Sequence, residues 1–146
     1  MTRSYSSVCI NKWFRPVASL AEMRREGLAE VAVGLHLGGE SLGTAELHIF
    51  GKGNLHTESV HLRNQFRKKG HGLPFYKELI FWARKLGARR LYSSVYLNRR
   101  SRRMWRDKLP RAGFIVKEAQ FSSTCYRCKA KSKQTRYYIE LCPTST

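Results

Sequence analysis

The stretch ESVHLRNQFRKKGHGLPFYKELIFWARKLG, residues 58–87, decides the fold, because it predicts a strand that leads through a basic turn into a helix. The turn itself, RKKGHG at residues 67–72, holds three cations and two glycines. A helix N-terminus offers unpaired backbone N–H groups and the positive end of the helix dipole. Glycine lets a ligand approach that backbone without meeting a Cβ atom. The turn therefore predicts a binding site for a phosphate or pyrophosphate group.

Two common phosphate loops are excluded by the residues around the turn. No Gly-Lys-Ser/Thr ends it, as a Walker loop requires, and the dinucleotide pattern G-x-G-x-x-G is absent. The turn matches R-x-x-G-x-G at Arg67, Gly70 and Gly72. This pattern resembles the acetyl-coenzyme-A pyrophosphate loop of the GCN5-related N-acetyltransferase (GNAT) superfamily. The alternative is a basic helix N-terminus that binds no particular ligand.

Upstream of the turn, the sequence predicts one helix and four strands. Residues 5–14 indicate a first strand, and residues 19–26 a short helix. Residues 30–50 predict a hairpin that reverses at Gly38-Gly39. Residues 55–62 predict the strand that leads into the phosphate loop.

Downstream, a helix with Pro74 in its first turn is expected to stop at Gly87. It is followed by a predicted strand, a helix capped by Asn98 and two strands, at residues 90–97, 98–109, 114–121 and 135–141. The order β-α-β-β-β-α-β-α-β-β predicts an α/β domain. The resemblance implies a mixed, mostly antiparallel sheet flanked by helices, in one domain over residues 1–146.

A second motif strengthens the resemblance. The superfamily pattern N-x-x-A/S-x-x-x-Y matches at Asn98 and Ser101, and its closing Gly-Phe at residues 113–114, so the likeness covers about residues 42–114. Trp105 stands where the tyrosine is usual, four extra residues follow it, and one N-terminal helix is visible where two are common. That tyrosine commonly protonates the leaving coenzyme A thiolate, and an indole N–H is too weak an acid to replace it.

The resemblance implies acetyl-coenzyme A as co-substrate and assigns its binding residues. The backbone of the strand before the loop would hold the pantetheine, the loop amides with Arg67 the pyrophosphate, and Asn98 would touch the cofactor from the neighbouring strand end. The expected cofactor-binding residues are Val60, His61, Leu62, Arg67, Lys68, Lys69, Gly70, His71, Gly72, Asn98 and Ser101.

Acetyl transfer to an amine also needs a base, which can act through water. Glu58 and Glu46 are the candidates, because they lie on adjacent predicted strands near the expected cleft. His61 and His48 are weaker candidates, since a strand histidine is more often structural. Tyr96 is the candidate acid in place of the missing tyrosine; otherwise solvent protonates the thiolate.

The charge is unevenly distributed. Residues 1–50 hold 5 basic and 5 acidic residues, so the whole net charge of +18 lies in residues 51–146. One small anion does not require this excess, which favours a polyanionic partner such as DNA, RNA or an acidic protein surface. A solvated basic surface is the alternative. The expected contacts are Arg99, Arg100, Arg102, Arg103 and Arg106, with Arg84, Lys85, Arg89 and Arg90 beside them.

The cysteines and the apolar pattern indicate the compartment. There are four cysteines, no apolar run of the ~20 residues that a membrane helix needs, and no signal-peptide pattern at the N-terminus. We therefore expect reduced thiols in a cytoplasm. Cys125-x-x-Cys128 has the spacing of half a zinc site, with Cys9 and Cys142 as the other half, but no metal is predicted because those two are not paired.

The sequence thus predicts an acetyl-coenzyme-A-dependent N-acyltransferase whose acceptor amine belongs to, or lies beside, a nucleic acid or a nucleic-acid-associated protein. The alternative is a basic module of the same fold that binds nucleic acid or inhibits an acidic protein without catalysis. The compact, basic chain also resembles small acetyltransferase-like proteins encoded by some bacteriophages, which would act in the host cytoplasm.

Overall fold

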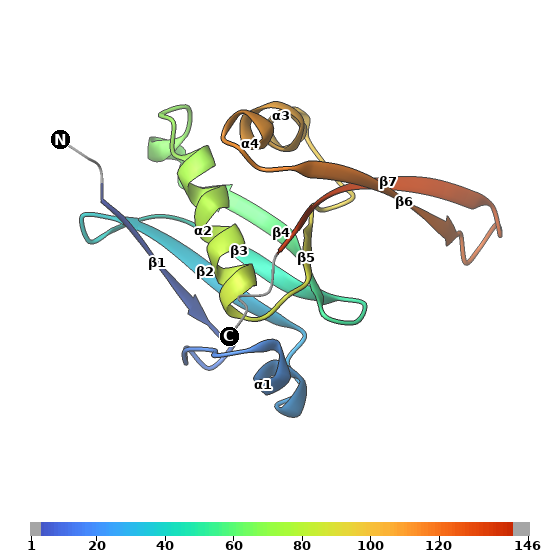
Figure 1. The fold of residues 1–146 in the computed structure, drawn as a ribbon, viewed down its shortest axis with the longest axis horizontal. Coiled ribbons are helices and arrows are strands. Elements are labelled where there is room, and N and C mark those ends of the chain that lie inside the picture. Colours follow the sequence, from blue (N-terminus) through green and yellow to red (C-terminus); the bar gives the residue numbers. More distant parts are fainter. Residues whose placement is uncertain (1–3, 142–146) are drawn as a thin grey trace.

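The computed structural model describes residues 4–141, which form one seven-stranded sheet with helices (Figure 1). The strands lie in the order β1-β2-β3-β4-β5-β7-β6, and every neighbouring pair is antiparallel except β4 and β5. Their bounds are Tyr5–Ile10 (β1), Glu30–Leu37 (β2), Glu40–Phe50 (β3), Asn54–Leu62 (β4), Arg90–Tyr92 (β5), Val116–Thr124 (β6) and Lys131–Glu140 (β7). The predicted mixed, mostly antiparallel α/β fold is confirmed.

The helices gather around the middle of this sheet. The longest, α2, crosses the face formed by β1 to β4, and α1 lies near one end of these strands (Figure 1). The helical segments are Leu20–Arg25 (α1), Asn64–Phe66 (η1), Gly72–Lys85 (α2), Arg99–Arg103 (α3), Met104–Lys108 (η2) and Leu109–Arg111 (α4). Among the described residues, none of the helices is long and apolar enough to span a membrane.

The core lies between α2 and the sheet. Five residues at helical spacing in and just after α2 are buried: Tyr76, Leu79, Ile80, Ala83 and Leu86. It packs with strand residues of the same cluster, among them the fully buried Leu47, Leu55 and Leu91. Each such side chain contributes roughly 1.5–3 kcal/mol when it leaves water. The helix is thereby fixed on the sheet, and with it the turn at its N-terminus.

A β-bulge in β4 changes the direction of its side chains. Glu58 pairs with Glu46 of β3, but the next pair is His61 with Thr44, so β4 has one extra residue there. Ser59 takes a left-handed backbone conformation, with φ of 50°. Beyond it, Val60 and Leu62 pack against the core. The backbone just before the phosphate loop is therefore irregular.

The sheet opens between β4 and β5. The predicted strand 90–97 is wrong in length, because β5 ends at Tyr92 and pairs with β4 only opposite residues 54–56. At Ser93 the pairing with β7 changes. Its N–H still donates to the carbonyl of Tyr137 at 2.7 Å, but the N–H of Tyr137 is accepted by the Ser93 hydroxyl at 3.0 Å instead of by the backbone carbonyl. The edge of β4 that faces β5 is therefore left without a strand partner from Thr57 onward.

Other predicted bounds also differ. The first strand stops at Ile10 rather than residue 14, because the side chain of Asn11 accepts the N–H groups of Trp13 and Arg15 and turns the chain. The last two strands, predicted at 114–121 and 135–141, form a longer hairpin, β6 and β7. Its outer arms are polar, so hydrophobic alternation did not reveal them.

The helix that begins after Asn98 is also longer than predicted. Asn98 caps it as expected, since its side chain accepts the N–H of Ser101 at 2.8 Å. The helix then passes through a π-helical turn, η2, and continues beyond Pro110 to Arg111. Proline is tolerated there because it lies in the first turn of α4. The π turn also changes which face of the helix is buried, and Lys108 is exposed.

Candidate functional site

A cavity of about 410 Å³ lies where β4, the basic turn, α2 and α3 meet. Ten of the eleven residues that the sequence assigned to cofactor binding line it: Val60, His61, Leu62, Arg67, Lys68, Gly70, His71, Gly72, Asn98 and Ser101. Lys69 is the one assigned residue that is absent from the described lining of the cavity. Residues from segments almost 40 positions apart therefore form one concave surface.

The basic turn is held in a defined shape. Lys68 and Gly70 have left-handed backbone conformations, with φ of 62° and 80°. A Cβ atom at Gly70 would have open space around it, whereas one at Gly72 would lie 3.1 Å from Cε of Met104. The backbone turn thus favours glycine at Gly70, whereas a Cβ atom at Gly72 would have to displace the end of the Met104 side chain slightly.

Two side chains of the turn fix it to the sheet. Arg67 folds back on β4, where its Nε donates to the carbonyl of Leu62 at 3.1 Å and its guanidinium lies 3.1 Å from Nδ1 of His61. His71 is buried, and its Nδ1 lies 2.9 Å from the hydroxyl of Tyr5 on β1. The turn is therefore anchored at both ends before any ligand binds.

Cations surround the cavity. Besides Arg67 and Lys68, the lining contains Arg100, Arg103 and Lys108 from α3 and η2. Arg100 and Arg103 were assigned to a polyanion by the sequence, but they face the cavity and can contact the phosphates of a cofactor. Part of the charge excess is thus explained by the small-molecule site itself.

Trp105 does not take part in the cavity wall. It is completely buried, and its indole N–H has no hydrogen-bond partner among the described residues. Tyr76 of α2 lines the cavity instead and packs edge-on against Trp105, with ring centroids 5.9 Å apart. Burial raises the pKa of Tyr76, while the neighbouring side chains of Ser101 and Trp105 act in the opposite direction. A phenol that stays protonated therefore borders the cavity.

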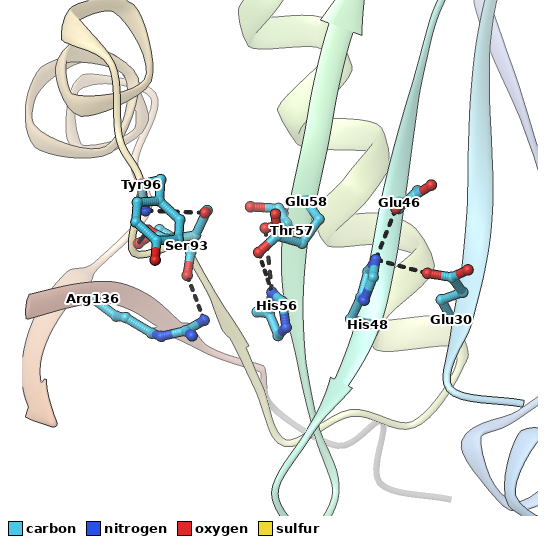
Figure 2. A network of polar contacts seen from close by, with 10 residues as sticks. Glu30, Glu46, His48, His56, Thr57, Glu58, Ser93, Tyr96 and Arg136 are labelled. Carbon is cyan, nitrogen blue, oxygen red and sulfur yellow. Dashed lines mark hydrogen bonds and ion pairs between the residues drawn. The ribbon is translucent and has the colours of Figure 1, made fainter. Parts of the chain in front are cut away.

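The opposite face of the sheet, which we call the outer face, carries carboxylates and histidines (Figure 2). His48 Nε2 lies 2.8 Å from Glu46 and 3.0 Å from Glu30, and His56 Nδ1 lies 3.3 Å from Glu58. Burial is the main cause that lowers the pKa of His56, so this imidazole is neutral near pH 7. Among the described residues, Glu30, Glu46 and His48 alone bring three potential metal-ligating atoms within 4.8 Å of one another.

The two predicted bases are confirmed as neighbours, since Glu46 and Glu58 are cross-strand partners. Glu58 lies on the segment of β4 that has no β5 partner, two residues before Val60 in the cavity lining. Tyr96 lies beyond β5 rather than on it, is 85% exposed, and faces the side of β4 that carries Glu58 (Figure 2).

Among the described thiols, Cys9 does not lie beside Cys125 and Cys128. Cys9 is buried on β1, and burial raises its pKa to about 12, whereas Cys125 and Cys128 are exposed beside β6 at the other edge of the sheet. Six strand spacings of about 4.8 Å separate those edges. Cys142 lies outside the described residues.

A concave basic site at a helix N-terminus, next to a sheet that opens between two parallel strands, fits the acyl-coenzyme-A-dependent transferase that the sequence predicted. The chain belongs to the acetyltransferase (GNAT) family, whose sequence model matches residues 5–109. Members of this family use acetyl-coenzyme A as co-substrate. A comparison with curated protein sequences gave no match.

Solved structures share the fold. An IAA acetyltransferase from Bacillus cereus superposes with a TM-score of 0.59 at 14% identity, over 94% of this chain and 100% of that one. The spermidine/spermine N-acetyltransferase SpeG from Vibrio cholerae, solved with manganese ions, gives 0.58 at 11% identity, over 93% and 92%. A Bacillus subtilis acetyltransferase in complex with CoA gives 0.56 at 15% identity, over 85% of each chain.

Proposed function

We propose that the protein binds acetyl-coenzyme A in the cavity and transfers its acetyl group to an amine that approaches from the outer face. The observation that carries this proposal is the position of Glu58. It lies on the same unpaired strand segment as the cavity residues Val60 to Leu62, but before the bulge, so it faces the opposite side of the sheet. A thioester held along this edge of β4 would meet an amine beside a carboxylate.

The residues divide between holding the cofactor and moving protons. The loop amides, Arg67 and Lys68 would bind the pyrophosphate. Backbone groups of Val60 to Leu62 on the edge that β5 leaves open would pair with the amides of the pantetheine. Asn98 caps α3 and would contact the same arm from the other side. Positioning of this kind supplies much of the rate enhancement of a two-substrate transfer.

In the reaction, a neutral amine attacks the thioester carbonyl, the C–N bond forms and the C–S bond breaks. The amine proton passes to Glu58, directly or through water, and the coenzyme A thiolate takes a proton in return. Tyr76 is our candidate proton donor for that last step, because it borders the cavity, whereas Trp105 does not. The sequence pointed to Tyr96 for this role instead.

The acceptor is proposed to be a cationic amine. Although the chain is strongly basic, the outer face concentrates the carboxylates of Glu30, Glu46 and Glu58. Aromatic rings continue this face, since Phe50 contacts Tyr92 and Phe121 edge-on. Carboxylates and aromatic faces both attract ammonium groups. Because SpeG is a spermidine/spermine acetyltransferase, these polyamines are the first acceptors to assay.

Acetyl-coenzyme A binding is the decisive test. Calorimetric titration at moderate salt is expected to give saturable binding in the micromolar range, driven by the cavity cations. The comparison with 3′-dephospho-coenzyme A measures how much of the affinity is general charge attraction. Heat that disappears as salt rises, with no saturation, would contradict the proposal and favour a basic module without catalysis.

Tyr76→Phe is expected to lower kcat about tenfold and to leave the KM for acetyl-coenzyme A unchanged, because the ring still packs on Trp105 while the proton donor is lost. The loss is limited because solvent can also protonate a thiolate with a pKa near 8.5. Tyr96→Phe is the matched control, and we expect no effect. The reverse result would assign the proton donor to Tyr96.

A polyanion remains a proposed partner for the exposed arginines outside the cavity. Arg99, Arg102 and Arg106 line a shallow hollow on the outer side of α3 and η2, next to Asp107. Their joint replacement by glutamine is expected to weaken binding of a short DNA or RNA duplex about tenfold at low salt and to reduce its salt dependence. Acetyl-coenzyme A binding should not change, since none of the three lines the cavity. An unchanged affinity of the triple variant for the duplex would mean that these three arginines form only a solvated surface.

A cytoplasmic location, in the host if a bacteriophage encodes the protein, agrees with the free thiols of Cys9, Cys125 and Cys128.

A further inference from the structure

The tip of the β6–β7 hairpin carries two thiols that the acetyltransferase site does not use. Cys125 and Cys128 are exposed in the connection between Thr124 and Lys131. The hairpin projects away from α2 and the strands around it, with the tip at its far end (Figure 1). Nothing in acetyl transfer requires a cysteine pair at this place.

Backbone hydrogen bonds hold the tip in a closed turn around the first cysteine. The N–H of Cys125 donates to the carbonyl of Ala130 at 2.8 Å, and the N–H of Lys129 donates to the carbonyl of Cys125 at 2.8 Å. Lys129 takes a left-handed conformation with φ of 58°, which costs about 1 kcal/mol for a residue with a side chain. The turn therefore has a specific shape rather than an extended one.

The shape of the turn points a backbone N–H group at the sulfur atom of Cys125. The N–H of Cys128 points to Sγ of Cys125 at 3.4 Å. Arg127, Lys129 and Lys131 add positive charge, and residues 124–134 include no carboxylate. A sulfur that accepts a backbone N–H and is surrounded by cations is suited to bind a metal ion as the thiolate.

We propose that Cys125 and Cys128 bind Zn²⁺ as a bidentate pair and that the same hairpin of a second copy of this chain completes the site. The C-x-x-C spacing is that of structural zinc sites, which are tetrahedral and take four protein ligands. Among the described residues, the two thiols belong to no group of three potential ligands. The remaining two ligands therefore come from outside this part of the chain.

Cys9, the other cysteine among the described residues, is poorly placed to complete the site, because it is buried at the opposite edge of the sheet. A second tip is exposed, offers the same two thiolates, and brings lysines and arginines that offset the negative charge of a zinc–tetrathiolate centre.

The test is titration of the reduced protein with Co²⁺ alone, followed by displacement with Zn²⁺. Thiolate coordination gives an intense near-ultraviolet charge-transfer band and tetrahedral visible bands. We expect both bands to reach their end point at half an equivalent of metal per chain, with protons released as the thiols ionise. The mass from light scattering should double over the same range and return with a chelator. Absence of the bands, or an end point at one equivalent with an unchanged mass, would overturn the proposal.

Single serine substitutions assign the ligands. Cys125→Ser and Cys128→Ser should each abolish the tetrathiolate spectrum and the metal-dependent mass change, whereas Cys142→Ser should alter neither. Loss of the spectrum in Cys142→Ser would show that the chain completes its own site and would overturn the second-copy assignment. Acetyl-coenzyme A binding should be the same in all three variants, which controls for folding because the tip lies outside the cavity lining.

Discussion

Gly70→Glu is expected to weaken acetyl-coenzyme A binding at least 100-fold, about 2.8 kcal/mol, while the fold is retained. A new side chain at this position would have open space, since no atom lies within 4 Å of the added Cβ. The φ of 80° makes the substitution strained by roughly 1–2 kcal/mol. The larger effect is electrostatic, because the carboxylate enters the turn where the pyrophosphate would be bound and competes for the same N–H groups and cations.

Gly87→Glu is the matched control for this substitution. Gly87 also has open space around a Cβ and a similar backbone conformation, with φ of 89°, so strain and charge change are the same. It follows the C-terminal end of α2, about 20 Å from the turn at 1.5 Å per residue. We expect a small loss of thermal stability and unchanged cofactor affinity. If Gly70→Glu and Gly87→Glu bound acetyl-coenzyme A with equal affinity, the assignment of the basic turn as the pyrophosphate site would be refuted.

Should Gly70→Glu fail to fold, Lys68→Glu gives a second test. Lys68 lines the cavity and already holds a left-handed conformation. The substitution therefore changes the charge without adding a Cβ atom. A loss of about tenfold in affinity is expected, and an unchanged dissociation constant would count against a pyrophosphate site.

The parts of the site that the sequence predicted are those encoded by adjacent residues. The basic turn, the start of α2 and the Asn98 cap each depend on a few neighbouring positions. In each case the first N–H groups of a helix need an acceptor from outside the helix. Tyr76 lies at helical spacing with the other buried residues of α2, and its side chain is buried. Its position at the cavity follows from tertiary packing against Trp105, which a one-dimensional pattern does not contain.

The features that open the site are long-range or irregular. β5 ends at Tyr92, where the Ser93 hydroxyl replaces the backbone carbonyl as acceptor of the N–H of Tyr137, 44 positions away, and the local sequence pattern does not contain this contact. The β4 bulge at Ser59 occurs without a glycine, which is the usual indication of a left-handed residue. The place of two arginines at the cavity could, however, have been predicted from the sequence. Arg100 and Arg103 are spaced by three on a helix that follows a predicted cofactor contact, so both could have been assigned to the cavity.

Glu58→Gln is expected to lower kcat about 100-fold with the best acceptor and to leave the affinity for acetyl-coenzyme A unchanged. Glutamine keeps the size and polarity of the side chain but cannot accept the amine proton. Glu58 is partly shielded, and His56 lies 3.3 Å from its carboxylate, so its orientation is constrained in the free protein. Coenzyme A release should be followed by chromatography, because the exposed Cys125 and Cys128 would react with thiol reagents.

Glu46→Gln discriminates between the two carboxylates, which face each other across β3 and β4. β3 is paired on both sides, by β2 and β4, so Glu46 lies one strand spacing, about 4.8 Å, farther from the open edge than Glu58. It also shares His48 with Glu30. We therefore expect Glu46→Gln to raise the KM for a cationic acceptor severalfold with little change in kcat. A large kcat loss in Glu46→Gln alone would move the base to β3, and unchanged kcat in both variants would mean that solvent takes the proton.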